Sequence, residues 1–316
     1  KIDSMPKTRE GVDLALADVT RHPVREYLRS LIWDGEKRCE TLFIDYLGAE
    51  DSRYTRTVTR KALIGAAARI LSPGCKHDHM LVLIGPQGCR KSTTLKKLGK
   101  EWFSDSLYTM SGKDAYEQLQ GFWIIELSEM AATRKAEVEQ IKQFVSKQED
   151  NYRAAYARRT QCHPRQCAFF GTTNDEEFLR DPTGARRFWP VVVTDAGKTL
   201  GDKLTASIVD QIWAEAVTYY EAGETWYLDG AVEEMARKVQ ADHTEANGKL
   251  GLIENFLEVL LPEGWDDWDL EKRLMFWSGG FGEERNGTVP RTKVCALEVW
   301  QEPVSYTHLR AHETTL

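Results

Sequence analysis

The sequence predicts an α/β fold with a parallel central sheet and helical regions on either side of it. Between residues 80 and 193, short apolar runs typical of strands alternate with segments compatible with helices. The first run, 81–84, leads through a glycine-containing turn into a helix, as in a strand–helix repeat. We expect an N-terminal helical subdomain at 1–76, a core at 77–200 and a C-terminal helical region at 201–303.

The N-terminal subdomain is expected to be two helical stretches. In the first, 20–48, apolar residues such as Tyr27 and Leu31 recur close to helical spacing after His22-Pro23. The second, 53–71, ends at a Pro-Gly pair that cannot continue a helix.

The core, 77–200, is expected to alternate between strands and helices. The expected strands cover 81–84, 102–108, 122–129, 167–174 and 187–193. The expected helices begin at Lys91 and cover 113–119 and 136–148.

The C-terminal region is expected to be helical at 206–222, 230–246 and 252–261. Beyond it, we interpret 270–277, the glycine-rich turn at 279–282 and 291–300 as pieces of a truncated winged helix. Residues 304–316 resemble a translated library-adapter sequence, so we expect the biological sequence to stop near Glu302 or Pro303.

Composition narrows the class of function. A net charge of −7 argues against a protein that binds nucleic acid over its whole surface. This net charge is compatible with a local basic groove. The sequence has no signal-peptide pattern and no apolar run long enough to cross a bilayer. The six cysteines are scattered, and neither the 75–79 nor the 162–167 cluster has the paired spacing of a zinc site. We therefore expect a cytoplasmic protein with no membrane partner.

Residues 85–93 have the order of a phosphate-binding loop. Backbone N–H groups in such a loop wrap phosphates, Lys91 would reach the β- and γ-phosphates, and Ser92 would bind Mg²⁺. The motif predicts a P-loop NTPase core and an ATP site made of Gly85, Gln87, Gly88, Cys89, Arg90, Lys91, Ser92 and Thr93. Arg90 stands where the motif has glycine, and it would either hinder phosphate approach or add a positive charge. The simpler alternative is an ordinary strand-to-helix turn.

Polar residues after later strands are candidates for catalysis. Glu126 ends an apolar strand and could hold Mg²⁺, while Glu129 could orient or deprotonate the attacking water. Asn174 ends another strand and could position water. The alternatives are solvated acids and a turn-capping asparagine.

Two groups of basic residues complete the candidate site. Arg186 and Arg187 precede a strand and are candidate arginine fingers, or else surface arginines or partners of the adjacent aromatic rings. The 147–165 segment combines basic and aromatic residues, which suits a single nucleic-acid strand but also a solvated hairpin. Its candidate DNA-binding residues are Lys147, Arg153, Tyr156, Arg158, Arg159 and Arg165.

These motifs together resemble the virulence-associated protein E family of phage and prophage ATPases, which are similar to superfamily-3 helicases. The matching stretches lie mainly within 20–195 and include His22-Pro-Val-Arg-Glu-Tyr-Leu, Gly85-Pro-Gln-Gly-Cys-Arg-Lys-Ser-Thr, Trp123-Ile-Ile-Glu-Leu-Ser-Glu, Gly171-Thr-Thr-Asn and Arg186-Arg-Phe-Trp-Pro. The resemblance implies a hexameric ring that replicates mobile-element DNA, with Asn174 as sensor and Arg186 or Arg187 as finger. It also implies a primase-type domain upstream, or primase and other replication proteins as partners.

The sequence therefore indicates a DNA helicase or translocase that hydrolyses ATP with Mg²⁺ at subunit interfaces. Its partner would be single-stranded or forked DNA, pulled by the hairpin around 153–165. Two alternatives remain: a P-loop kinase of small molecules, and a regulator that binds DNA under the control of ATP.

Overall fold

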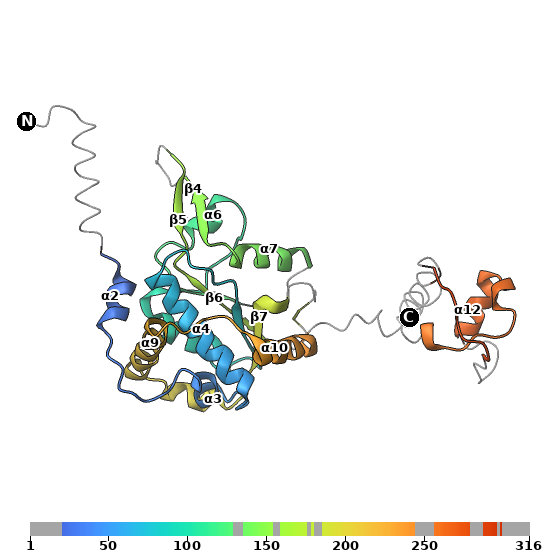
Figure 1. Ribbon diagram of the computed structural model, residues 1–316, viewed down its shortest axis with the longest axis horizontal. Coiled ribbons are helices and arrows are strands. Elements are labelled where there is room, and N and C mark those ends of the chain that lie inside the picture. Colours follow the sequence, from blue (N-terminus) through green and yellow to red (C-terminus); the bar gives the residue numbers. More distant parts are fainter. Residues whose placement is uncertain are drawn as a thin grey trace, which may run out of the picture. The chain divides into compact units, whose positions relative to one another are not determined.

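The computed structural model contains two compact units, 1–245 and 246–316 (Figure 1). It describes residues 21–128, 135–153, 159–175, 178–179, 185–243, 256–278, 287–295 and 298. Across these ranges, no helix combines the length and the apolar character that a bilayer-spanning segment needs.

A five-stranded sheet forms the centre of the first unit. Its strands run in the order β2-β3-β6-β1-β7, and all the pairings are parallel, as the sequence predicts. The bounds are β1 Met80–Ile84, β2 Phe103–Ser104, β3 Ile124–Leu127, β6 Ala168–Thr173 and β7 Phe188–Val192. Pro190 lies in β7, an edge strand, where a missing N–H breaks no ladder between central strands.

Helices cover both faces of the sheet, which is why β1, β3 and β6 are apolar and buried along almost their whole length. Alternate side chains face opposite ways. Leu81 and Leu83 join the core formed with α2–α5 and α9, whereas Val82 joins the core formed with α6 and α7. The bounds are α2 Pro23–Ser30, α3 Leu42–Leu47, α4 Arg53–Leu71, α5 Lys91–Gly99, α6 Gly112–Glu117, α7 Lys135–Val145 and α9 Ala206–Glu221.

Helix α9 lies beside α4 in the first unit (Figure 1). The rings of Trp123 and of Trp213, on α9, contact each other at a tilt of 41°, with centroids 4.2 Å apart. Each indole is buried and donates to a backbone carbonyl, at Ala66 and Leu98 respectively. Helix α10, Gly230–Asp242, also packs on α4 and β7. The expected C-terminal region thus contributes two helices to the same compact unit as the sheet.

The expected helical stretch 20–48 is wrong in its middle. Residues 31–41 form a loop between α2 and α3, and Gly35 adopts φ +90° within it. The side chain of Asp34 accepts a hydrogen bond from the N–H of Glu36 at 3.0 Å, which stabilises a turn in place of a helix.

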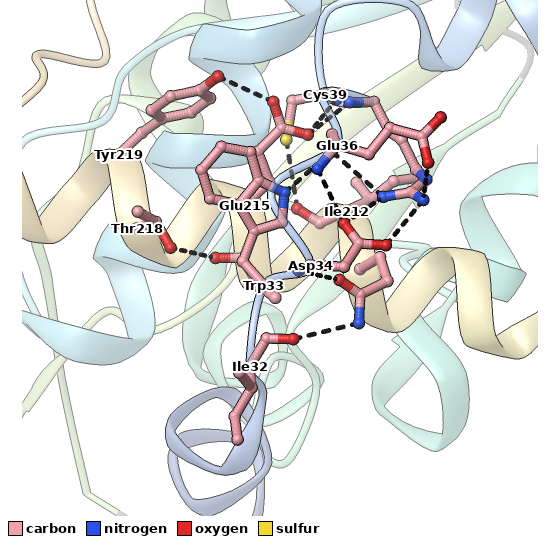
Figure 2. Close-up of polar contacts among 12 residues, drawn as sticks. Ile32, Trp33, Asp34, Glu36, Cys39, Ile212, Glu215, Thr218 and Tyr219 are labelled. Atoms are coloured by element: carbon pink, nitrogen blue, oxygen red, sulfur yellow. Dashed lines mark hydrogen bonds and ion pairs between the residues drawn. The ribbon is translucent and has the colours of Figure 1, made fainter.

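Helix α9 fastens this loop through a buried carboxylate (Figure 2). Glu215 is 0% exposed, and its Oε2 accepts from the backbone N–H groups of Arg38 at 2.6 Å and Cys39 at 2.8 Å. Tyr219 donates its hydroxyl to Glu215 Oε1 at 2.9 Å. Burial, and the neighbouring Glu215, raise the pKa of the Cys39 thiol. Both oxygens of Glu215 are therefore occupied by protein donors.

A second, two-stranded sheet is the antiparallel pair β4 Glu149–Tyr152 and β5 Gln161–Pro164, which extends beyond the main sheet (Figure 1). In the unit 246–316, Phe256, Leu261, Trp265, Phe276 and Trp277 form a small core. Helix α12, Leu270–Ser278, coincides with the 270–277 piece of the expected winged helix. The winged helix stays a prediction, because 279–282 lies outside the described residues and 291–295 adopt neither helix nor strand.

Candidate functional site

The candidate site is a cavity of about 810 Å³ at the carboxyl edge of the main sheet. Strands β1, β3 and β6 all end here, because their register pairs Ile84 with Thr173 and Leu127 with Gly171. The cavity is lined by Gln87, Gly88, Cys89, Arg90, Lys91, Ser92, Thr93, Ser128, Thr172, Thr173, Asn174 and Asp175. Ligands in open parallel sheets bind at this edge.

The β1–α5 loop, residues 85–90, forms one wall. Helix α5 begins at Lys91, so Lys91, Ser92 and Thr93 form the first turn that faces the cavity. No acidic residue lies in that turn. The unpaired N–H groups of a helix N-terminus and its partial positive charge suit an anion.

Lys91 and Asn174 meet inside this wall. Lys91 is 7% exposed, and its Nζ donates to Asn174 Oδ1 at 2.9 Å. It also donates to the carbonyl oxygens of Gly85 and Pro86, at 2.5 and 3.0 Å. The ammonium is thus satisfied by neutral acceptors, these oxygens and Cys89 Sγ at 3.7 Å, which an anionic phosphate oxygen could replace at a gain in electrostatic energy.

Glu126 is the buried acid of the site. The hydroxyls of Ser92 and Thr172 both donate to Glu126 Oε1, each at 2.6 Å. Glu126 is 2% exposed, and its Oε2 has no hydrogen-bond partner among the described residues. A buried carboxylate oxygen without a donor is costly unless a cation or water binds it.

This donor set fits Mg²⁺. A serine hydroxyl beside a buried carboxylate offers hard oxygen ligands, and Mg²⁺ keeps several waters and usually adds phosphate oxygens. Within the described part of the chain, no group of three or more His, Cys, Asp or Glu residues could hold a metal. The remaining ligands of a cation at Glu126 would therefore come from a phosphate and from water.

Thr172 is a site residue that the sequence reasoning missed. It is 4% exposed and lies on β6, two residues before Asn174. The available signal was a hydroxyl residue near the polar end of an otherwise apolar strand. Its partner could not be identified, because the β3–β6 register decides which residues face Glu126.

Arg90 occupies the left-handed region, at φ 71° and ψ 20°. This is the conformation that glycine adopts readily and that other residues adopt at a cost, which explains why the motif has glycine here. The Arg90 guanidinium pairs with Asp202 at 2.9 Å, in the 3₁₀ helix η4, Gly201–Lys203. The side chain is therefore held against η4.

Arg186 and Arg187 lie at the opposite edge of the sheet. They end the 3₁₀ turn η3, Ala185–Arg187, directly before β7, and Phe188 is level with Met80, the first residue of β1. Five residues of β1 therefore separate them from the β1–α5 loop, roughly 16 Å along the strand. The structure does not bring these arginines to Lys91 of the same chain.

The two arginines also differ from each other. Arg187 is half-buried, and its Nε donates to Ser146 Oγ at 2.8 Å. Arg186 is exposed, and it makes no hydrogen bond or ion pair with any other residue that the structure describes. Arg186 is therefore the more exposed of the pair.

The predicted DNA-binding residues lie around the β4–β5 hairpin, but not all of them are accessible. Arg153 and Arg159 are exposed on the hairpin, while Lys147 is half-buried and donates to the hydroxyl of Tyr116. The assignment of Arg165 to DNA is wrong in this structure. Tyr156 and Arg158, and the candidate catalytic Glu129, lie outside the described residues.

Arg165 is a structural cation at the base of the hairpin. It is 2% exposed, and its Nε donates to Asp150 Oδ2 at 3.0 Å. The guanidinium also donates to the carbonyl of Phe144 and lies 4.7 Å from the Phe144 ring centroid. A buried guanidinium with these partners cannot reach a phosphate backbone without breaking the ion pair.

The fold and the site define an α/β protein with a parallel five-stranded sheet and a candidate anion site at its carboxyl edge. The family model of the virulence-associated protein E-like domain matches residues 28–245. The chain belongs to this family, as the motifs of the sequence predict.

Similar solved structures include apo forms of the NrS-1 C-terminal region. Two of them are 14% identical to this chain, with TM-scores of 0.47 and 0.44, and each match covers 90% of this chain and 68% of the other. A third is 12% identical with a TM-score of 0.47, and covers 88% of this chain and 64% of the other. No curated protein matches the sequence.

Proposed function

We propose that this chain is the ATP-hydrolysing core of a DNA helicase or translocase, acting in the replication of phage or other mobile-element DNA in the host cytoplasm. The observation that carries the proposal is the meeting of Lys91, Ser92 and Asn174 in one cavity, beside a helix N-terminus, with the buried Glu126 hydrogen-bonded to Ser92. Family membership supports it, because the same residues carry the resemblance to ATPases.

Each residue has a defined task in this proposal. Lys91 binds the β- and γ-phosphates, and Asn174 accepts from Lys91 until it orients the attacking water. Ser92 and the free Oε2 of Glu126 hold Mg²⁺, which supplies charge neutralisation when bound. The loop N–H groups bind the remaining phosphate oxygens.

The position of Arg186 favours a ring of subunits, which we propose to be a hexamer. Within one chain the arginine and the cavity lie at opposite edges of the sheet. In a head-to-tail assembly, the amino edge of one subunit would face the carboxyl edge of the next, and Arg186 would enter the neighbour's ATP site.

We place the DNA strand at the β4–β5 hairpin, whose exposed Arg153 and Arg159 suit phosphate contacts. The Asp150–Arg165 pair fixes the base of the hairpin to α7 and the sheet. Motion of the hairpin would therefore follow motion of α7, and Ser146, the residue after α7, accepts a hydrogen bond from Arg187.

The test is ATP turnover by the purified protein with and without single-stranded DNA, alongside Lys91→Ala. We expect DNA to stimulate turnover several-fold and Lys91→Ala to abolish it. Turnover that does not change with DNA and requires a small acceptor molecule would contradict the translocase and indicate a P-loop kinase of small molecules. Tight ATP binding without turnover would leave an ATP-gated regulator of DNA binding.

A further inference from the structure

The segment after β7, residues 194–203, runs along the outside of the β1–α5 loop. It contains α8, Gly197–Leu200, and then η4. Thr194 fastens its start to α3, where its N–H donates to the Leu47 carbonyl at 3.1 Å and its hydroxyl to the Gly48 carbonyl at 3.2 Å. Near its end, Asp202 holds Arg90. The segment therefore lies between the N-terminal helices and the loop.

Gly197 is the point where three backbones meet. It is buried, and a Cβ built on it would lie 2.4 Å from the carbonyl oxygen of Cys89 in the β1–α5 loop. On its other side the same atom would lie 3.3 Å from the Leu47 Cα. A methyl group cannot fit at the first distance unless a backbone moves, because interiors are close-packed.

Conformation does not explain this glycine. Gly197 has no positive φ, and it begins a helix, where alanine is intrinsically better than glycine. Among the contacts that its Cβ would make, the close approach of the Cys89 carbonyl is the one that most strongly requires the missing side chain. Cys89 Sγ in turn lies 3.7 Å from Lys91 Nζ, so displacement of Cys89 would move the residues that face the cavity.

We propose that Gly197 is a positioning residue for the ATP site: it lets the 194–203 segment hold the β1–α5 loop in the shape that binds phosphate. The inference rests on the proposed function of that cavity. It assigns a role to a residue about a hundred positions from the loop, outside every motif of the sequence.

Gly201 provides a weaker version of the same contact. Its built Cβ would lie 3.2 Å from Arg90 Cβ and 3.4 Å from Arg90 Cγ. The nearer atom, Arg90 Cβ, is fixed to the loop backbone, but at 3.2 Å a shift of a few tenths of an ångström relieves the contact. Replacing Arg90 with glycine would remove both of the opposing atoms.

The experiment compares Gly197→Ala, Gly201→Ala, the double variant Gly201→Ala/Arg90→Gly and wild type. Thr199→Ala is the matched control, because Thr199 lies on the exposed side of the same short helix. Binding of Mg²⁺-ATP with a fluorescent ribose label is measured by anisotropy, and folding by thermal melting. The alkylation rate of Cys89 by iodoacetamide, followed in its own peptide without nucleotide, reports the loop independently.

We expect Gly197→Ala to weaken nucleotide binding by about tenfold or more and to speed alkylation of the buried Cys89, at a melting temperature near that of wild type. Gly201→Ala should have a smaller effect that Arg90→Gly reverses. Thr199→Ala should behave as wild type.

Wild-type nucleotide affinity in Gly197→Ala would overturn the inference. If Gly197→Ala does not fold, the comparison of Gly201→Ala with Gly201→Ala/Arg90→Gly decides. Weaker nucleotide binding in Gly201→Ala that the added Arg90→Gly restores supports the inference. Normal binding in Gly201→Ala, or no restoration, overturns it. Wild type that binds no nucleotide would refute the proposed function instead. The Cys89 alkylation rates would then still show whether Gly197 positions the loop.

Discussion

Two buried carboxylates in this protein differ in one respect: Glu215 has donors on both oxygens, and Glu126 has donors on only one. At Glu215, two backbone N–H groups and the Tyr219 hydroxyl occupy both oxygens and fix the 31–41 loop. At Glu126, two hydroxyls share Oε1, and Oε2 lacks a partner among the described residues. Burial alone therefore does not distinguish the two acids, whereas the unfilled oxygen of Glu126, next to the cavity-lining Ser92, does.

The largest expected effect is on activity at Glu126. Glu126→Gln should lower DNA-stimulated ATP turnover about 100-fold or more, because the ligand of the proposed Mg²⁺ site loses its charge. The unfolding free energy, measured in urea, should stay within about 1 kcal/mol of wild type or rise, since a buried charge without a second donor is removed. If Glu126→Gln lost as much unfolding free energy as Glu215→Gln, described next, the proposed difference between the two carboxylates would be wrong.

The matched change, Glu215→Gln, should act on stability. An amide cannot accept hydrogen bonds at both of its ends, so at least one buried donor is left unpaired, at a cost of about 2–3 kcal/mol. The control is Gln211→Ala, which removes more exposed contacts to the same loop and should cost about 1 kcal/mol or less. Urea unfolding followed by tryptophan fluorescence gives both values. Equal losses of unfolding free energy in Glu215→Gln and Gln211→Ala would contradict the importance of the buried carboxylate.

A third buried group extends the comparison to pH. Burial, together with nearby Arg69 and His79, lowers the pKa of His77 well below its ordinary value, so this histidine is neutral in the folded protein. The unfolded chain binds the proton near pH 6.5, and stability should therefore be complete above that pH and fall as the pH drops below it. The expected slope from this one group is about 1.4 kcal/mol per pH unit.

Chemical unfolding at pH 7.5, 6.5 and 5.5 measures this slope. The variant His77→Gln should show a shallower dependence on pH than wild type. An unchanged slope would mean that other groups control the acid sensitivity.

The smallest effect is expected at Arg90, where the strain and the ion pair oppose each other. Arg90→Asn keeps a residue that tolerates the left-handed region but loses the partly exposed pair with Asp202. The net change in unfolding free energy should stay within about 1 kcal/mol. Nucleotide affinity should also stay within about threefold, because the guanidinium is held by Asp202. A larger loss of affinity would mean that Arg90 contacts the phosphates.

The sequence predicts much of the core of this fold because its strands and helices carry local signals. The run 81–84, the helix from Lys91 and the helix 53–71 agree with the structure to within about a residue, since apolar periodicity and caps determine them. The stretch 20–48 fails because one turn, at Asp34 and Gly35, outweighs a favourable periodicity.

In the candidate site too, local motifs predict some residues, and tertiary contacts determine the others. Lys91, Ser92 and Asn174 follow from motifs, whereas Thr172 depends on the strand register and Gly197 on a tertiary contact. Arg165 was misassigned because composition counts positive charges but does not show which of them have a buried partner such as Asp150. Local patterns thus predict the residues of a loop, but not the surroundings that orient them.

The placement of the two proposed halves of the active site has a consequence for how activity depends on dilution. Each chain carries the proposed phosphate-binding edge and the edge with the two arginines, and the parallel sheet keeps them apart. Turnover per subunit would then rise with protein concentration until assembly is complete. A chain with an intact cavity would also work only as well as the arginine edge of its neighbour allows.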